Sequence, residues 1–210
     1  MHLLYFADPM CSWCYGFGPQ LSQVLRAHPE TVLDVVMGGL RAYNREPMSD
    51  AFREMLQGHW DHVGQASGLP FTPRALEGEE FIYDTEPACR AVVTARNLDR
   101  ARALDFLKAL QHAFYAEGRD ITRARVMAEV AASCGYAHSD FLRDLESEEM
   151  RQETRGDFTT SQRLGVSSFP TLVMSLGDEL YLLTSGYVAA AVLEERIAEI
   201  RRLSAAAGSP

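Results

Sequence analysis

Two cysteines stand three positions apart near the start of the chain, in the sequence CSWC at residues 11–14. On a helix, side chains at positions i and i+3 lie on one face, about 5–6 Å apart at Cβ, so their sulfurs can form and break a disulfide bond. We expect Cys11 to begin a helix, where unpaired N–H groups and the helix dipole favour an anion. Because the thiolate is the attacking species in disulfide exchange, Cys11 is the predicted nucleophile and Cys14 the predicted resolving thiol.

The residues between the cysteines are candidates for tuning the pair and contacting substrate. Ser12 can hydrogen-bond a sulfur, and Trp13 offers an apolar surface beside it. A C-x-x-C pair is also half of a zinc site, but no second such pair or H-x-x-x-H motif follows. Only Cys89 and Cys134 could complete four ligands. We therefore expect no metal at these thiols and no bound cofactor.

A second informative stretch is GVSSFPTLVM at residues 165–174. Pro170 stands just before a predicted buried strand and follows Phe169, which makes their peptide bond a candidate for the cis form. If Pro170 faces Cys11, the backbone of Phe169 can pair with an extended substrate strand and present its disulfide to the thiolate. Phe169 and Pro170 are therefore predicted substrate-binding residues. A proline at a strand start is also a common edge feature.

Other residues offer weaker candidates. Cys89 follows TEP at a predicted helix start, so either its pKa is lowered or it is a small buried apolar residue. Cys134 stands at a helix end, where it is predicted to be inert. His59 and His62 share a helix face with the spacing of a metal pair, although two histidines without a third ligand more often form a solvated face.

The apolar pattern predicts two strands at the start of the chain and two near its end. They cover residues 2–8, 31–40, 170–176 and 179–187. The first pair flanks a helix from Cys11 to His28, which implies parallel strands with a right-handed crossover. The last pair flanks a Gly-Asp turn and reads as a hairpin. Five or six helices are predicted between Ser49 and Leu164, and a final amphipathic helix at residues 189–203.

Composition limits the partners. The 210 residues are 47% hydrophobic, which indicates a folded globular protein. With 20 basic and 29 acidic residues the net charge is −9, so nucleic acid and anionic membranes are not expected partners. The start MHLLYFADP lacks a basic region, and no segment approaches about 20 uninterrupted apolar residues. We expect a cytoplasmic protein, where cysteines are more often chemical than structural.

The motifs DPMCSWCYGFGP and GVSSFPTLV, in this order and separation, resemble those of the DsbA-like branch of the thioredoxin superfamily. The chain is similar to its intracellular FrnE-type predicted disulfide isomerases. The resemblance implies an α/β thioredoxin-like fold with a large all-helical domain inserted between the second and third strands. The implied domains are residues 1–44 with 165–210, and the insertion 45–164. Cys11 would be the nucleophile, Cys14 the resolver and Pro170 the cis-proline.

One position departs from the family pattern. Thioredoxin-type proteins often hold a buried acid six positions before the nucleophile, where this chain has Tyr5. The nearest acid is Asp8. Two interpretations stay open: Asp8 relays a proton to Cys14, or it is a strand-end or N-cap residue.

Three functional hypotheses follow. The first is a cytoplasmic thiol-disulfide oxidoreductase that reduces or isomerises disulfides of proteins or peptides and is recycled by glutathione or another thiol. The second is a glutathione-dependent small-molecule isomerase or transferase of the kappa-class type. Those relatives typically carry serine where Cys11 stands and need no second thiol. The third is a peptide-binding module that uses the thiols as a redox sensor.

Overall fold

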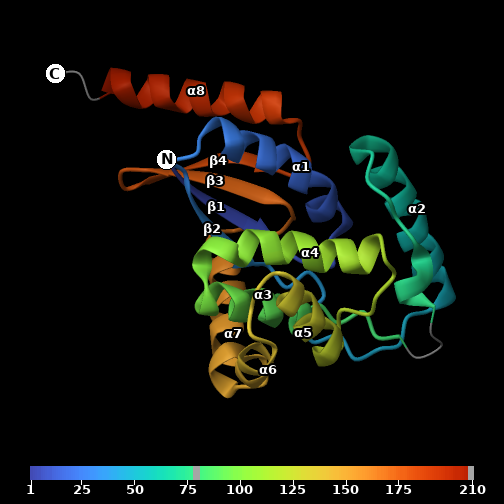
Figure 1. Cartoon of the computed structure of the whole chain (residues 1–210). Helices are drawn as coiled ribbons and strands as arrows, with labels where there is room; N and C mark the ends of the chain where they lie inside the picture. The colour runs from blue at the N-terminus through green and yellow to red at the C-terminus, as the bar shows by residue number, and fades with distance from the viewer. Residues whose placement is uncertain (78–80, 208–210) are drawn as a thin grey trace.

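A four-stranded sheet organises the protein (Figure 1). The computed structural model describes residues 1–77 and 81–207. Strands β1 (His2–Ala7) and β2 (Val32–Met37) are parallel, whereas β3 (Thr171–Leu176) runs antiparallel to β1 and to β4 (Glu179–Ser185). The strand order is β2-β1-β3-β4. The parallel first pair and the terminal hairpin predicted from the sequence are both confirmed.

Helices connect and cover these strands. Helix α1 (Ser12–Ala27) joins β1 to β2, and α8 (Ala190–Ala207) follows β4. In the described residues six α-helices separate β2 from β3, as the sequence predicts: α2 (Asp50–Ser67), α3 (Glu86–Leu98), α4 (Ala103–Tyr115), α5 (Ala124–Ser133), α6 (His138–Leu145) and α7 (Glu148–Arg163). Two short 3₁₀ helices, η1 (Pro73–Leu76) and η2 (Arg100–Arg102), were not predicted.

The sheet has apolar side chains on both faces, because α1 and α8 lie on one side and α3 and α7 on the other (Figure 1). Successive side chains of β1 alternate between the faces. Leu3 and Tyr5 join the main core, whereas Phe6 packs with Val36 and Val173 in a smaller cluster. The continuous apolar character of β1 therefore reflects burial from both sides.

The helical segment is tied to the end of β2 by a partly buried ion pair. Arg96 of α3 bonds both carboxylate oxygens of Asp157 on α7, at 2.8 and 3.0 Å. Asp157 also accepts the Met37 N–H at 2.8 Å, and Arg96 donates to the carbonyl of Val35. Burial raises the pKa of Asp157, and Arg96 opposes that rise. These bonds hold β2 to α3 and α7, and β2 leads directly to Gly38, which lies against Phe169.

Helix α2 lies at one end of the molecule (Figure 1). Ser49 caps it by accepting the Phe52 N–H. The sequence predicts an apolar face on α2 that includes Met55. Only Trp60 and Val63 of this helix are buried, and Met55 is 47% exposed. Helix α2 packs against α1 at a glycine: a Cβ on Gly16 would lie 2.8 Å from the Val63 side chain.

The observed order of elements confirms an α/β fold with a helical segment between the second and third strands. The exact boundaries at residues 44/45 and 164/165 stay a prediction. Within residues 1–77 and 81–207, no helix combines the length and apolarity needed to cross a bilayer.

Candidate active site

Cys11 is the N-cap residue of α1, as predicted. Its carbonyl accepts the N–H groups of Cys14 and Tyr15, at 3.0 and 3.2 Å, and so begins the helix. The first turn of α1 contains no acidic residue. The sulfur therefore stands at the helix end that stabilises an anion, with no carboxylate in that turn to oppose the field. Cys11 is 7% exposed, whereas Cys14 is completely buried.

Cys14 lies one turn into the helix and is a free thiol, like Cys11. Burial raises the pKa of Cys14 well above its ordinary value, and the neighbouring Cys11 raises it further. The backbone N–H of Asp8 opposes the shift only in part. The two sulfurs are thus placed differently: Cys11 is slightly exposed at a helix start, and Cys14 stays protonated behind it.

The Phe169–Pro170 peptide bond is cis and lies at the thiols, as the sequence predicts. The Cys11 thiol donates a hydrogen bond to the carbonyl of Phe169, with 3.4 Å between sulfur and oxygen. Gly38 makes room for the Phe169 ring, because a Cβ there would lie 2.0 Å from its Cζ atom. The glycine after β2 therefore allows Phe169 to reach this position, a role that the sequence did not reveal.

Ser12 and Trp13 are both partly exposed beside the pair. In the described part of the chain, the Ser12 hydroxyl makes no hydrogen bond to either sulfur, so the expected Ser12–sulfur bond is not formed. The Trp13 ring packs on Tyr187, with 5.6 Å between ring centroids. Tyr187 follows β4 and receives a hydrogen bond from Gln20 of α1. Sequence reasoning missed Tyr187, since no local pattern marks it.

Asp8 is completely buried just after β1. Its carboxylate accepts the N–H of Met10 at 2.8 Å and of Leu40 at 2.7 Å, so it fixes the segments that follow β1 and β2. Burial raises the pKa of Asp8, and these two bonds lower it in part. Asp8 is not the N-cap, because that position belongs to Cys11. No side-chain hydrogen bond joins Asp8 to Cys14 among the described residues.

Tyrosine hydroxyls bind the backbone around the thiols. Tyr83 donates to the carbonyl of Met10, directly before Cys11. Tyr5, at the position of the family's buried acid, donates to the carbonyl of Cys14 at 3.5 Å. Burial raises the pKa of both tyrosines, so they stay neutral donors at neutral pH.

The remaining candidates lie outside this arrangement or behind it. Cys89 is completely buried on α3, and its thiol donates to Asp8 at 3.4 Å. Burial raises the pKa of Cys89, so the interpretation as a reactive helix-start thiol is wrong. Burial also raises the pKa of Cys134. His59 and His62 are exposed on α2, and the described residues hold no group of three His, Cys, Asp or Glu side chains that could bind a metal.

Comparison with known proteins identifies the family. A sequence model of the thioredoxin family matches residues 4–194. A predicted protein disulfide isomerase from Nitrosomonas europaea is 33% identical, with a TM-score of 0.89, over 96% of this chain and 98% of that one. This chain is a DsbA-like member of the thioredoxin superfamily. The thioredoxin-like fold expected from the two motifs is therefore confirmed.

Two further relatives of this DsbA-like protein carry functional descriptions of their own. The cytosolic disulfide reductase DsbM from Pseudomonas aeruginosa is 25% identical, with a TM-score of 0.79, over 96% of this chain and 99% of that one. DsbM has also been solved with GSH. The ClpXP adapter protein SpxH from Bacillus subtilis is 21% identical over 82% of this chain and 57% of its own length. The chain thus spans less than two thirds of that curated relative.

Proposed function

We propose that this protein is a thiol-disulfide oxidoreductase that reduces or isomerises disulfide bonds of proteins or peptides. The proposal rests on one relationship: the Cys11 sulfur stands at a helix start and faces the carbonyl of Phe169, which precedes the cis-proline Pro170. Family membership supports the same chemistry, and the disulfide reductase DsbM has a similar structure.

The reaction begins when the Cys11 thiolate attacks a substrate disulfide. A Cys11–substrate mixed disulfide forms, and one substrate thiolate leaves. Cys14 then loses its proton and attacks the Cys11 sulfur, which forms the Cys11–Cys14 disulfide and releases the second substrate thiolate. The substrate gains two electrons and the enzyme loses two. Glutathione or another thiol returns them to the enzyme, and the GSH-bound structure of DsbM supports a thiol partner of this kind.

Substrate is expected to bind along the segment that carries Phe169 and Pro170. An extended peptide would pair with the backbone of Phe169 and bring its disulfide to Cys11. Trp13 and Ser12 would flank the peptide at the start of α1. The packing of Trp13 on Tyr187 supports this, because it holds a flat apolar surface beside the nucleophile.

The roles of the two thiols are tested by insulin reduction. Cys11→Ser should abolish turnover, while Cys14→Ser should accumulate mixed disulfides, because nothing resolves them. Cys134→Ser is the matched control, since Cys134 lies outside the pair, and it should retain full activity. Turnover by Cys11→Ser would overturn the assignment.

A second candidate is a glutathione-dependent isomerase or transferase of the kappa-class type. The GSH-bound structure of DsbM favours this candidate, whereas the presence of a second, buried thiol at Cys14 favours disulfide chemistry. Turnover of a glutathione conjugate by Cys14→Ser, without insulin reduction by the unmodified protein, would select this candidate.

We place the protein in the cytoplasm as part of the same proposal. The similar DsbM is a cytosolic reductase. In a reducing compartment the pair is held as two thiols, so electron donation to substrate is the expected direction. Equilibration of the pair against glutathione buffers of graded potential measures this direction. A pair that stays oxidised at cytosolic potentials would contradict it.

A further inference from the structure

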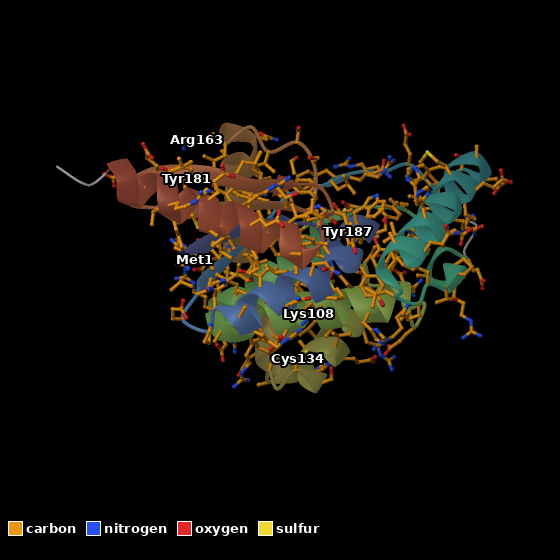
Figure 2. The ribbon with its side chains drawn as sticks, turned by 90° about the horizontal axis from the view of Figure 1, so that it is seen from above. Met1, Lys108, Cys134, Arg163, Tyr181 and Tyr187 are labelled. Atoms are coloured by element: carbon orange, nitrogen blue, oxygen red, sulfur yellow. The ribbon has the colours of Figure 1, made fainter. Side chains whose placement is uncertain are left out.

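A cavity of about 360 Å³ lies between α1 and α4. Its volume is in the range of small-molecule sites, which is about 300–1,000 Å³. It is lined by Tyr15, Gly18, Pro19, Ser22 and Arg26 of α1, by Leu69, and by Lys108, Gln111 and His112 of α4. Figure 2 labels Lys108 where α1 and α4 overlap in the view from above.

The charged side chains in this lining are all basic. Lys108 is the only lysine of the chain, and the other 19 basic residues are arginines. Its ammonium group donates to the Ser22 hydroxyl at 3.0 Å and has no carboxylate within 4 Å in the described residues. Arg26 likewise has no ion pair there, and His112 contacts Glu117 at 3.8 Å. A protein of net charge −9 thus keeps two uncompensated cations at one cavity.

Two buried polar groups of the same lining lack hydrogen-bond partners. The side-chain amide nitrogen of Gln111 and the hydroxyl of Tyr15 are buried and have no hydrogen-bond partner in the described residues. Gln111 is 1% exposed and Tyr15 is 6% exposed. A buried donor without an acceptor costs about 1–3 kcal/mol. Both atoms are closed to solvent, so they do not open into the cavity, and the cations and apolar side chains are the groups that a bound molecule would contact.

The rest of the lining is apolar. Tyr15, Pro19 and Leu69 contribute a ring and two aliphatic side chains. The Tyr15 ring is held from behind, because it stacks on Tyr115 at 5.1 Å and meets Phe71 edge-on at 5.3 Å. The cavity therefore combines a rigid apolar wall with cations.

We propose that this cavity binds a small organic anion, with a carboxylate or phosphate head held by Lys108 and Arg26 and an apolar body against Tyr15 and Leu69. Charge-assisted hydrogen bonds from both cations hold the head. Tyr15 is one helical turn from Cys11 and donates its N–H to the Cys11 carbonyl, so one end of the cavity lies on the helix that begins with the redox pair. The site does not depend on thiol chemistry and is tested without it.

The single lysine makes the test specific. Reductive methylation with ¹³C-formaldehyde labels the amine of Lys108 and the α-amine of Met1 and keeps both charges. Figure 2 shows these two residues well separated, so the Met1 NMR signal is an internal reference. Phenyl phosphate and benzoate are titrated separately, with neutral benzyl alcohol as the uncharged control. We expect a saturable shift of the Lys108 signal with at least one anion, and none at Met1.

A variant pair separates a built site from general electrostatics. Arg26→Gln should weaken binding of the anion about fivefold, the loss of one partly exposed charged contact. Arg163→Gln removes the same charge at the end of α7, away from Lys108 (Figure 2), and should leave the dissociation constant unchanged. Shifts that never saturate, equal shifts at Met1, equal binding of benzyl alcohol, or equal losses in both variants would each overturn the proposal. The outcome is independent of insulin reduction.

Discussion

The Cys11 thiol and the Phe169 carbonyl are 3.4 Å apart, although 158 residues separate them in the chain. The antiparallel pairing of β1 with β3 brings them together, because Phe6 of β1 is opposite Thr171, directly after Pro170. The last residues of β1 and the first residues of β3 therefore lie side by side at the same end of the sheet. The helical segment between them does not disturb this register.

Gly38 should be necessary for the position of Phe169. In Gly38→Ala the new Cβ would overlap the Phe169 ring, so the ring must move away from Cys11. We expect a loss of stability of about 1–3 kcal/mol, typical of overpacking, and slower insulin reduction. Gly58→Ala is the matched control, because a Cβ there meets nothing within 4 Å on an exposed helix face. Urea unfolding and initial rates measure both effects, and equal behaviour of the two variants would contradict the assigned role.

Asp8 should make stability depend on pH. Its pKa is raised in the folded protein, so folding takes up a proton between the unfolded value, about 3.9, and the raised folded value. Stability from this group is therefore present at low pH and is lost as the pH rises through that window. Asp8→Asn should remove this dependence of stability on pH. It should also lower the free energy of unfolding by the same amount at every pH, because its hydrogen bonds to the backbone are weaker. Unfolding free energies from pH 4 to 7 test this; an unchanged slope in the variant would refute it.

The four cysteines should react in a defined order. Burial and raised pKa values protect Cys14 and Cys89, which are completely buried, whereas Cys11 is 7% exposed at the start of α1. With iodoacetamide at neutral pH we expect Cys11 to be modified first, the partly exposed Cys134 more slowly because burial raises the pKa of its thiol, and Cys14 and Cys89 only after denaturation. Peptide mass mapping of the reduced protein gives the order. Early modification of Cys89 would show that its buried environment opens.

The Arg96–Asp157 pair should contribute far more than surface pairs. Asp157→Asn leaves the guanidinium of Arg96 largely buried without its counter-charge, and we expect a loss of about 3–5 kcal/mol. The comparison is Arg143→Gln, which breaks an exposed pair with Asp140 and Asp144 and should cost at most about 1 kcal/mol. Chemical denaturation measures both; similar losses would mean that the buried pair does not hold β2 to the helices.

Local patterns predicted most of the elements. The apolar runs around Leu3 and Val35 gave two strands that are buried on both faces, and the cap at Ser49 gave the start of α2. The pattern was misleading at Met55, since an apolar stripe does not say how much of a helix finds a partner. It was silent on η1 and η2, which are too short to show a period.

The sequence alone determined the chemistry: two thiols one turn apart, the second motif with Phe169 and Pro170, and the helices and strands that carry them. These follow from short-range spacing, which a linear chain displays directly. Tertiary structure decided the rest. It buried Cys89 against Asp8, placed Tyr187 on Trp13, and grouped Arg26 with Lys108 around one cavity. Burial and contacts between distant segments arise only when the helices pack, and they set the pKa values and the free space that local spacing does not encode.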